Sequence, residues 1–409
     1  MYRIGEALVG KDNEVAHIDL IIGTKDGNVG QAFANGLVSL SKGHTPILCV
    51  IRPNLPPKPH VLIVPKVTVD DMADAGKIFG PAQAAVSKGI ADAVEEGVLD
   101  EYKDRLDDLV IIASVFVHPE ATDYRKIYQY NYGAVKLALR RAVSNYPGIE
   151  KVMFEKDRAM HPIMGFKVPR LPAWNAPYLQ IALDVGSYTA AERVIRDLPC
   201  SDKLIIEIGT PLIKAEGVKI INRIREHCPN SFIIADLKAL DVGDVEVDLA
   251  YDATADAVVV SGLGSKVMIK EFIDEAEKLG IYSIVDTMNV RDSKGNFNPM
   301  EMLKSLDKLP DIVLLHRGIS GEKEIPEDVL WGFVETIKEY GKTKGKNLLV
   351  GVAGGIEAHN VGDVVERGAD IIVIGRYITQ AKDVRRSAED VLRNLGGDID
   401  LKRVHKKTD

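Results

Sequence analysis

The second half of the chain contains eight short apolar runs, and several of them stop at a charged residue or a glycine. The runs cover residues 179–184, 204–209, 232–238, 257–262, 282–286, 311–316, 348–355 and 370–376. Each run is short enough to be a fully buried parallel strand, and the stretches between them, such as 188–198 and 267–280, have helical spacing. This alternation predicts a (β/α)8 barrel, which is an α/β fold.

The carboxyl ends of the strands form the catalytic face in barrels of this kind, so side chains at the predicted strand ends should converge on one mouth. The charged residues at those ends are Asp184, Glu207, Asp236, Lys238, His316 and Arg376. This placement predicts an enzyme with a site in the second half of the chain.

A chain of 409 residues exceeds what one hydrophobic core usually organises, so we expect two domains. Prolines interrupt any regular element between residues 165 and 178, just before the first barrel strand. The predicted organisation is an N-terminal domain over residues 1–166, a semi-rigid proline-rich linker over 167–178 and the barrel over 179–409.

The N-terminal half mixes strand and helix patterns. Strand patterns cover residues 15–23, 45–51, 60–69 and 108–119, and helical patterns cover 32–43, 72–99 and 125–146. Strands in succession with helices grouped elsewhere predict a layered α+β domain, in which helices cover one face of a sheet.

The composition excludes several classes of function. Hydrophobic residues make up 46% and charged residues 27% of the chain, which is ordinary for a soluble globular protein. No apolar run approaches the roughly 20 residues of a membrane helix, and the N-terminus lacks a signal-peptide layout, so we expect a cytoplasmic protein without a membrane partner. A net charge of −8 argues against nucleic acid as a partner, and the basic cluster at residues 401–409 is expected to be a solvated end.

Asp236 and Lys238 lie two residues apart at a predicted strand end, hence on the same side, and Asp241 follows in the loop. Carboxylates near a lysine can hold a divalent cation, orient a phosphorylated sugar and set the proton affinity of the lysine. Taken alone, the pair is equally well explained as a surface ion pair. Glu207 and Asp184 at neighbouring strand ends favour a site.

Glycines follow the last two apolar runs. Gly354 and Gly355 come after the seventh run, and Gly375 and Arg376 after the eighth. Barrels of this class commonly bind phosphate here through backbone N–H groups and a helix N-terminus, and arginine adds a bidentate clamp. Glycine alone is a weak signal, because any barrel needs tight turns, but the placement favours a phosphorylated substrate.

His316 ends the sixth run. A single histidine in a sequence is usually structural or on the surface. This one falls at the catalytic end of a predicted strand, and its pKa near neutrality suits it to moving a substrate proton, so we favour catalysis.

The motifs IADLKALDVG, VAGGI and VIGR, with Glu207 and His316, resemble the orotidine-monophosphate-decarboxylase suprafamily, and within it the hexulose-6-phosphate synthase branch, over about residues 178–395. The resemblance implies Mg²⁺ held by Glu207 and Asp236, with Mn²⁺ as the alternative. It implies Lys238 and Asp241 near the reacting end, and phosphate held by Gly354, Gly355 and Arg376. Barrels of this family are dimers in which the Asp241 position reaches the site of the neighbouring subunit.

The reaction implied by this resemblance is that of an aldehyde-lyase, in which ribulose 5-phosphate and formaldehyde combine reversibly to a 3-hexulose 6-phosphate. The metal would stabilise the enediolate formed when a base such as His316 removes the C1 proton. The chain continues as HRGISGEKE, without the aspartate that usually follows the glycine in this family, which leaves the contacts of this loop open. The alternative is decarboxylation of a 3-keto-gulonate 6-phosphate through the same enediolate.

His17 and Asp19 share one face of a predicted strand, and alone they indicate an exposed ion pair. The surrounding motifs GEALVG, NEVAHIDLIIG, HTPILCVIRPN, PKVTVDD, GPAQAAV and HPIMGFKVPR resemble the formaldehyde-activating enzyme over nearly all of residues 1–170. The resemblance implies an α+β fold like the second domain of ribosomal protein S5, assembled as a ring of five. It also implies a hydro-lyase reaction that joins formaldehyde and tetrahydromethanopterin into the methylene derivative and water.

On matching positions the resemblance implies that His17 is the general acid, because loss of hydroxide from a carbinolamine requires a proton donor. The residues implied to line the pterin and aldehyde site are Asp19, Leu48, Lys66, Thr68 and Gln83. Without the resemblance, Lys66 is an ordinary surface lysine and Gln83 a helix residue among small neighbours.

The two resemblances together predict a bifunctional, homo-oligomeric enzyme. Its substrates would be small molecules: formaldehyde, tetrahydromethanopterin, hexulose 6-phosphate and ribulose 5-phosphate. In archaea such a fusion would run the barrel toward cleavage, for ribulose 5-phosphate supply, while the N-terminal domain captures the formaldehyde. The alternative interpretation assigns no catalysis to the N-terminal domain, which would then be only a carrier of the pterin or formaldehyde, or an oligomerisation module.

Overall fold

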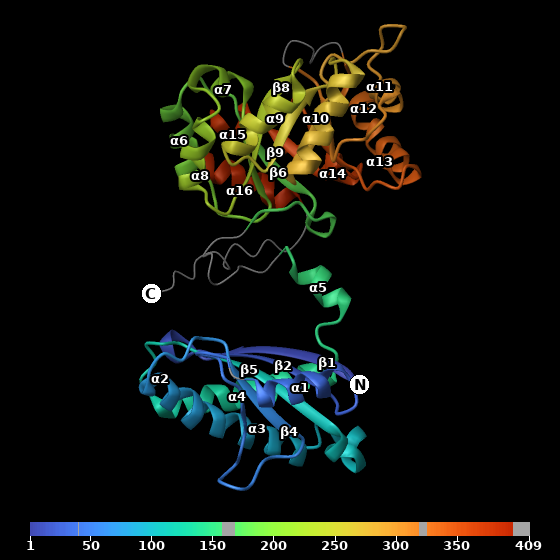
Figure 1. Cartoon of the computed structure of the whole chain (residues 1–409). Coiled ribbons are helices and arrows are strands. Elements are labelled where there is room, and N and C mark those ends of the chain that lie inside the picture. Colours follow the sequence, from blue (N-terminus) through green and yellow to red (C-terminus); the bar gives the residue numbers. More distant parts are fainter. Residues whose placement is uncertain (40, 158–167, 319–324, 396–409) are drawn as a thin grey trace. The chain divides into compact units, whose positions relative to one another are not determined.

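The computed structural model describes residues 1–39, 41–157, 168–318 and 325–395. The chain divides into two compact units, Met1–Lys156 and Asp157–Asp409, called here the N-terminal unit and the barrel unit (Figure 1). The two-domain organisation is thereby confirmed. The basic cluster at 401–409 lies outside the described residues. None of the helices in the described part of the chain has the length and apolar character needed to cross a membrane.

The N-terminal unit is built on a five-stranded sheet with the strand order β1-β2-β5-β4-β3. Its strands are β1 (Tyr2–Val9), β2 (Ala16–Thr24), β3 (Ile47–Leu48), β4 (His60–Pro65) and β5 (Leu109–Val117). All neighbours are antiparallel except β4 and β5, which run parallel. The helices are α1 (Asn28–Val38), α2 (Met72–Lys77), α3 (Gln83–Glu95), α4 (Tyr124–Val143) and α5 (Ile149–Glu155), with short turns η1 (Asp12–Glu14), η2 (Ile78–Ala82) and η3 (Asp100–Asp108).

The alternation of apolar and polar residues in β2 explains the layers of this unit. Ile18 and Leu20 are fully buried in a core shared with α3 and α4, so these helices cover one face of the sheet. His17 and Asp19 point to the other face, as the period of two requires. Helix α1 covers only part of that face, through Phe33. The predicted α+β layering is confirmed, although α1 adds a helix on the second face.

Strand β1 is missing from the sequence analysis, which assigned no element to residues 2–9. The large apolar side chains Ile4 and Leu8 are more than half exposed, whereas Gly5 faces the helices. A Cβ atom at Gly5 would lie 1.9 Å from the carbonyl oxygen of Ala138, so α4 lies directly against the strand. Because the small residue points inward and the large ones outward, hydrophobic patterning does not reveal this strand.

The helical region predicted over residues 72–99 is divided in the structure. A π-helical segment, η2, separates α2 from α3, and Pro81 lies inside it. Proline lacks the N–H needed for the regular helical ladder, which explains the local widening. The strand predicted over 45–51 is reduced to the two residues of β3.

The barrel unit is a closed barrel of eight strands, all parallel, which confirms the predicted fold. The strands are β6 (Tyr178–Leu183), β7 (Leu204–Ile208), β8 (Phe232–Ala239), β9 (Ala257–Ser261), β10 (Tyr282–Asp286), β11 (Ile312–His316), β12 (Leu349–Ala353) and β13 (Ile371–Ile374). Each of the eight apolar runs coincides with one strand to within a few residues, because strands buried on both faces are largely apolar along their length.

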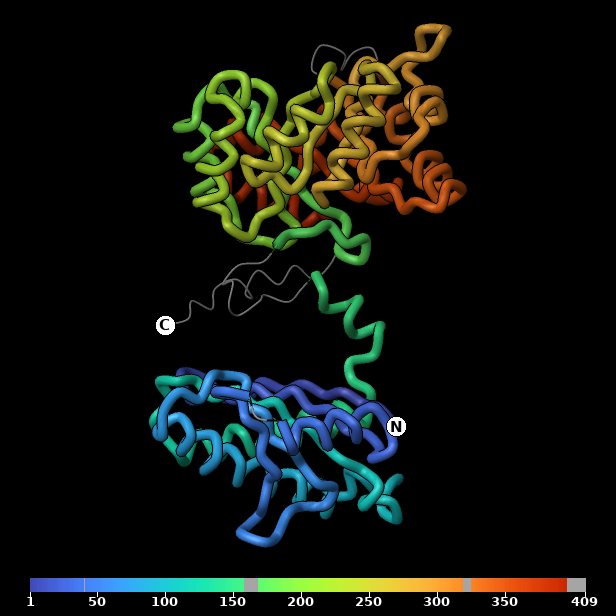
Figure 2. The backbone as a smooth tube through the Cα atoms, viewed as in Figure 1, coloured from blue at the N-terminus to red at the C-terminus, as the bar shows by residue number. Residues whose placement is uncertain are grey.

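Helices surround the strands, and Figure 2 shows α9 and α10 side by side on the outside of the barrel. The helices are α6 (Tyr188–Asp197), α7 (Thr210–Glu216), α8 (Ile220–His227), α9 (Gly243–Asp252), α10 (Lys266–Leu279), α11 (Pro299–Ser305), α12 (Glu327–Trp331), α13 (Phe333–Thr343), α14 (Val361–Glu366), α15 (Arg376–Thr379) and α16 (Val384–Asn394), with a short turn η4 (Ala173–Asn175).

The proline-rich segment before β6 packs against the amino-terminal end of the barrel. Leu171 is buried in the same cluster as the inward-facing side chains of the strands. Its backbone N–H donates to the Tyr282 hydroxyl at 3.3 Å, and the Tyr178 hydroxyl donates to the Pro172 carbonyl at 2.8 Å. The described residues from Leu171 onward therefore belong to the packing of the barrel, where the sequence had suggested a linker.

Candidate active sites

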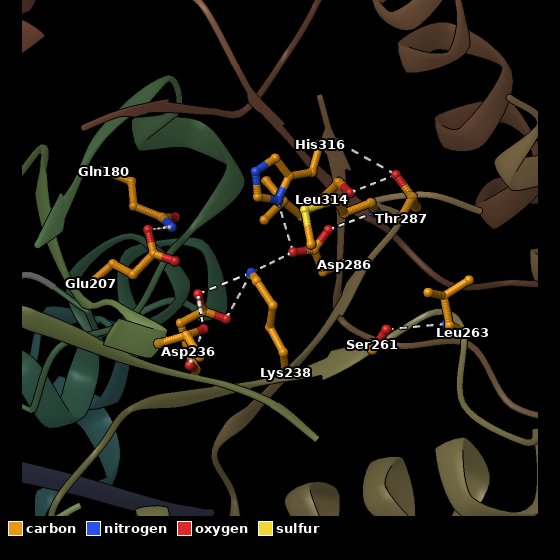
Figure 3. Close-up of polar contacts among 12 residues, drawn as sticks. Gln180, Glu207, Asp236, Lys238, Ser261, Leu263, Asp286, Thr287, Leu314 and His316 are labelled. Carbon is orange, nitrogen blue, oxygen red and sulfur yellow. Dashed lines mark hydrogen bonds and ion pairs between the residues drawn. The ribbon is translucent and has the colours of Figure 1, made fainter. Parts of the chain in front are cut away.

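A buried carboxylate joins two basic side chains at the mouth of the barrel. Asp286, the last residue of β10, is 1% exposed. Its Oδ2 accepts a hydrogen bond from Lys238 Nζ at 2.7 Å and one from His316 Nδ1 at 2.8 Å (Figure 3). Its Oδ1 accepts from the Met288 backbone N–H at 2.8 Å, which fixes the carboxylate. The three side chains come from β8, β10 and β11, so strand ends that are distant in sequence meet as predicted.

The charged groups of this cluster shift one another's pKa values. Burial would raise the pKa of Asp286, but His316 and Lys238 outweigh it and hold that pKa well below its usual range. Burial would lower the pKa of Lys238, but the carboxylates of Asp286 and Asp236 keep it above its ordinary value. Lys238 is therefore a cation at neutral pH.

His316 is oriented by the same carboxylate. Burial would lower the pKa of the imidazole, yet Asp286 reverses this and keeps the pKa of His316 above its ordinary value. Because Nδ1–H donates to Asp286, Nε2 is the nitrogen left to exchange a proton with a substrate. A histidine made more basic by a carboxylate is suited to general base chemistry.

The contact between Asp236 and Lys238 is confirmed, at 3.0 Å between Oδ2 and Nζ. Asp236 is 4% exposed and also accepts from the Thr210 hydroxyl at 2.9 Å. The local geometry is not that of a regular strand: the β8–β9 register shifts between Ala235 and Ala239, and Lys238 has a φ of 47°. Left-handed non-glycine residues and bulges concentrate at functional sites, where they redirect a side chain.

Glu207 lies inside the barrel, 4% exposed, and its Oε2 accepts from Gln180 Nε2 at 2.9 Å. Burial, and then the nearby Asp236 carboxylate, raises the pKa of Glu207 to about 8. Figure 3 shows the Gln180 and Glu207 pair beside the Asp236 and Lys238 contact. Two carboxylates are thus confined close together, which is costly unless a cation or a proton accompanies them.

The other predicted carboxylates differ in position. Asp184 follows β6 at the mouth and is exposed to solvent, but partial enclosure of its carboxyl group by neighbouring residues and then the Asp236 charge raise its pKa. A Cβ atom at Gly209 would lie 2.2 Å from Asp184 Oδ1, so Gly209 makes room for that carboxylate. Asp241 is exposed in the loop after β8 and accepts from its neighbour Val242. Among the residues that the structure describes, no contact joins Asp241 to the cluster around Asp286.

The glycines predicted to bind phosphate follow β12 and β13, which are neighbours in the barrel. Gly354 and Gly355 have φ values of 110° and 72°, which only glycine adopts easily. Gly375 precedes the short helix α15, and Arg376, its first residue, is exposed. All four lie at the carboxyl ends of their strands, hence at the same mouth as Asp286.

In the N-terminal unit, His17 lies between two carboxylates on neighbouring strands. Its Nε2 is 3.1 Å from Glu6 Oε1 and 3.5 Å from Asp19 Oδ1. Glu6 and Asp19 are partners in the β1–β2 register. Lys66, just after β4, forms an ion pair with Asp19. These four side chains form a row of alternating acidic and basic residues on the sheet face that α3 and α4 leave open.

The remaining predicted residues of this unit lie around β3 and β4. Leu48 packs with α1 on the same face as His17. The Thr68 hydroxyl is 3.3 Å from His44 Nε2, a histidine that sequence analysis did not single out. Gln83 is 7% exposed in the helical layer, and its amide donates to the Val50 carbonyl at 2.7 Å. Gln83 therefore anchors the segment that follows β3.

Besides His44, sequence analysis did not single out Asp286, Gln180 or Glu6. Asp286 ends the apolar run YSIVD, so its position at a strand end was a usable signal. Gln180 lies inside an apolar run, where a buried amide needs a partner, and Glu207 is that partner. Glu6 is on the strand that the pattern did not reveal, so no signal pointed to it.

Comparison with known proteins bears on both units. The family model described as Formaldehyde-activating enzyme (Fae) matches residues 4–164, and the model described as Orotidine 5'-phosphate decarboxylase / HUMPS family matches residues 177–391. A "Bifunctional enzyme Fae/Hps" of Methanocella arvoryzae is 55% identical over 405 residues, which is 99% of this chain and 99% of the relative. The chain belongs to the bifunctional Fae/Hps family.

A second Fae/Hps protein, from Methanothrix thermoacetophila, is 54% identical over 99% of each chain. Among solved structures, the 3-hexulose-6-phosphate synthase from Salmonella typhimurium is 29% identical, with a TM-score of 0.47, and covers 53% of this chain and 98% of its own. The Fae match contains the row around His17, and the second match contains the cluster around Asp286. Each half of this Fae/Hps chain thus carries one candidate site.

Proposed function

We propose that the chain is a bifunctional formaldehyde-handling lyase. The N-terminal domain, residues 1–166, condenses formaldehyde with tetrahydromethanopterin to methylene-tetrahydromethanopterin and water. The barrel, residues 179–409, catalyses the reversible aldol cleavage of a 3-hexulose 6-phosphate to ribulose 5-phosphate and formaldehyde. The observation that carries the proposal is the 55% identity to a bifunctional Fae/Hps enzyme over 99% of both chains.

The cluster around Asp286 supports aldol chemistry through an enediolate. In the condensing direction, Nε2 of His316 takes the C1 proton of ribulose 5-phosphate, and Asp286 holds the resulting imidazolium. Lys238, kept cationic by two carboxylates, stabilises the negative oxygen that develops. The C1 carbanion then adds to the carbonyl carbon of formaldehyde, the alkoxide that forms on the aldehyde oxygen takes a proton back from the His316 imidazolium, and cleavage runs the same steps backward.

The residues present fit a Mg²⁺ ion, with Mn²⁺ as the alternative. The carboxyl groups of Glu207 and Asp236 are buried close together, so the negative charge of one makes ionisation of the other less favourable. A divalent cation between them would relieve this repulsion. No group of three acidic, histidine or cysteine side chains in the described ranges is arranged to hold a metal. Magnesium commonly uses one or two carboxylates and takes its other ligands from water and substrate. When bound, it supplies Lewis-acid stabilisation of the enediolate oxygens.

Phosphate recognition is proposed for the backbone of Gly354, Gly355 and Gly375 with the Arg376 side chain. The positive φ values at the first two glycines expose backbone N–H groups without Cβ atoms in the way. Asp184 and Asp241 are proposed to contact the sugar, the latter from a neighbouring subunit. The exposure of Asp241 in the single chain supports this assignment.

In the N-terminal domain, His17 is proposed as the general acid that protonates the leaving hydroxide of the carbinolamine. Its Nε2 lies 3.1 Å from Glu6 Oε1 and 3.5 Å from Asp19 Oδ1, so these two carboxylates hold the ring in position. Lys66 neutralises Asp19 from the far side. Leu48, Thr68 and Gln83 are proposed to line or support the pterin and aldehyde site.

The proposal includes a homo-oligomer in the cytoplasm, where sugar phosphates and the pterin are available. Large apolar side chains lie exposed on β1, including Tyr2 at 57%, and on α9, including Leu249 at 52%. Exposed apolar surface of this kind commonly marks protein interfaces. Light scattering of the purified chain tests this part, and a strict monomer would refute it.

The central experiment supplies the purified protein with hexulose 6-phosphate, Mg²⁺ and tetrahydromethanopterin, and follows methylene-pterin formation with and without EDTA. We expect metal-dependent formation that is faster than the spontaneous reaction of free formaldehyde with the pterin. Product from free formaldehyde but none from the sugar phosphate would retain the N-terminal assignment and refute that of the barrel. Carbon dioxide release from 3-keto-gulonate 6-phosphate, without formaldehyde from the hexulose, would establish the decarboxylase instead.

A further inference from the structure

Arg317 follows the proposed base His316 but turns away from it. The arginine is 7% exposed, and it lies on the segment whose contacts the sequence had left open. Its backbone N–H donates to the Ala353 carbonyl at 3.0 Å, which extends the β11–β12 pairing by one residue. The guanidinium is thereby aimed at the turn that follows β12.

Three segments of chain meet at this guanidinium. Nη2 donates to Glu327 Oε1 at 2.7 Å and to the Gly354 carbonyl at 3.2 Å, and Nη1 donates to the Ile325 carbonyl at 3.2 Å. The fork of an arginine can bind several acceptors in one plane, which a lysine cannot do. One buried side chain therefore ties the end of β11, the start of α12 and the turn after β12 together.

The two glycines of that turn lie in close contact with Arg317. A Cβ atom at Gly354 would lie 2.3 Å from the Arg317 carbonyl oxygen, and one at Gly355 would lie 2.5 Å from Nη2. Both glycines also have positive φ values. Gly354 thus lies against the backbone of residue 317, whereas Gly355 lies against the guanidinium itself, and the bond to the Gly354 carbonyl links the turn to the arginine side chain.

We propose that Arg317 is a positioning residue for phosphate: it fixes the Gly354–Gly355 turn in the form whose backbone N–H groups receive the phosphate of the substrate. This inference rests on the proposed function, which assigns phosphate binding to that turn. Arg317 acts through the turn and does not touch the sugar. Glu327 fixes the guanidinium further, because its carboxylate accepts from Nη2, the same nitrogen that donates to the Gly354 carbonyl.

The test measures inorganic phosphate as a competitive inhibitor of hexulose 6-phosphate cleavage, using the full chain. For Arg317→Met we expect the inhibition constant of phosphate and the KM of the sugar phosphate to rise roughly tenfold, as loss of a buried charged hydrogen bond implies. The kcat at saturating substrate should change far less, because the base and the cation are untouched. A purely structural role would instead reduce the amount of active enzyme and leave both constants unchanged.

The chain offers a matched control at the opposite end of the barrel. Arg225 of α8 donates to Asp256 Oδ2 at 2.6 Å and to the carbonyl oxygens of Thr254 and Ser231, so it also ties three segments together. Arg225→Met should destabilise the barrel comparably while the phosphate inhibition constant stays unchanged. An equal rise in that constant for both variants would overturn the inference, as would no rise in Arg317→Met.

Glu327→Gln serves if Arg317→Met does not fold, because it leaves the arginine and its bond to Gly354 in place. We expect the phosphate inhibition constant of this variant to rise by a smaller factor, and an unchanged constant would overturn the inference. Methylene-pterin formation from free formaldehyde reports in the same samples that the N-terminal unit is intact. A wild-type barrel that cleaves the hexulose but is not inhibited by phosphate would refute the phosphate site itself. A barrel inactive on the hexulose would refute the proposed function.

Discussion

Lys238 and His316 share one acceptor atom, Oδ2 of Asp286, at 2.7 and 2.8 Å. The proposed electrostatic stabiliser and the proposed base are therefore fixed relative to each other by a single buried oxygen. A change at Asp286 should therefore disturb both roles together.

Replacement of Asp286 by asparagine should lower the exchange rate of the C1 proton of ribulose 5-phosphate about 100-fold, the typical contribution of a positioned base. Burial opposes the charge on His316, and Asp286 is what keeps its pKa above the ordinary value. Without that carboxylate the pKa falls, so the residual activity should persist to lower pH than in the wild type. Proton exchange followed by NMR across pH measures both effects. An acid limb at an unchanged pH would contradict the assignment of His316.

Lys238 should not form a Schiff base with the substrate. A nucleophilic amine must be neutral, whereas two carboxylates keep Lys238 protonated. Borohydride reduction in the presence of ribulose 5-phosphate should therefore leave the mass of the peptide that contains Lys238 unchanged. Lys238→Met should reduce kcat by about 100-fold or more, as loss of an electrostatic stabiliser does. A covalent sugar adduct on Lys238 would refute the enediolate route proposed here.

Mg²⁺ should stabilise the wild-type barrel against heat and should have little effect on Glu207→Gln. Burial and the Asp236 charge raise the pKa of Glu207 to about 8, so near neutral pH the metal-free barrel must either protonate this buried side chain or bear the cost of its charge, and the variant avoids both. In EDTA the variant should melt no lower than the wild type. Scanning calorimetry with and without Mg²⁺ measures this, and an equal Mg²⁺ effect on both proteins would remove Glu207 from the metal site.

His17→Asn should reduce methylene-pterin formation toward the spontaneous rate, by about 100-fold or more at saturating pterin. Hexulose 6-phosphate cleavage by the same preparation should be unaffected, because the two sites belong to separate units. The cleavage rate thus serves as the internal control. Unchanged pterin activity in the variant would leave the N-terminal unit as a carrier or an assembly module.

Gly5→Ala should destabilise the N-terminal unit by about 1–3 kcal/mol, the usual cost of overpacking. The added methyl would lie 1.9 Å from the Ala138 carbonyl oxygen, which is backbone and cannot move freely. Gly133→Ala on α4 is the control, since its Cβ would make an ordinary contact of 3.6 Å with Val9. Hydrogen exchange of the β1 peptide measures both, and protection equal to the wild type in Gly5→Ala would contradict the close approach of α4.

The barrel could be predicted from the sequence because its strands are buried on both faces and are therefore visible in the sequence as apolar runs. The ends of those runs located Glu207, Asp236, Lys238 and His316 for the same reason. The bulge that redirects Lys238 could not be predicted, since a left-handed lysine has no sequence signature.

Less of the N-terminal unit could be predicted from the sequence. Strand β1 turns Gly5 toward the helices and exposes its larger side chains, the reverse of the usual pattern. Because β1 was not predicted, Glu6 was not predicted either, although it lies as close to His17 as any predicted partner. Pairing between β1 and β2 depends on contacts across the sheet, which a local pattern does not record.

Leu171 and its apolar neighbours among the described residues pack the interior of the barrel beneath the strand ends, which makes that interior a core rather than a pore. In the proposed reaction, the sugar phosphate would therefore enter, and formaldehyde and the pentose phosphate would leave, on the same side of the barrel. Substrate and products would then compete for one region of space, so product release could limit turnover as much as the chemical step does.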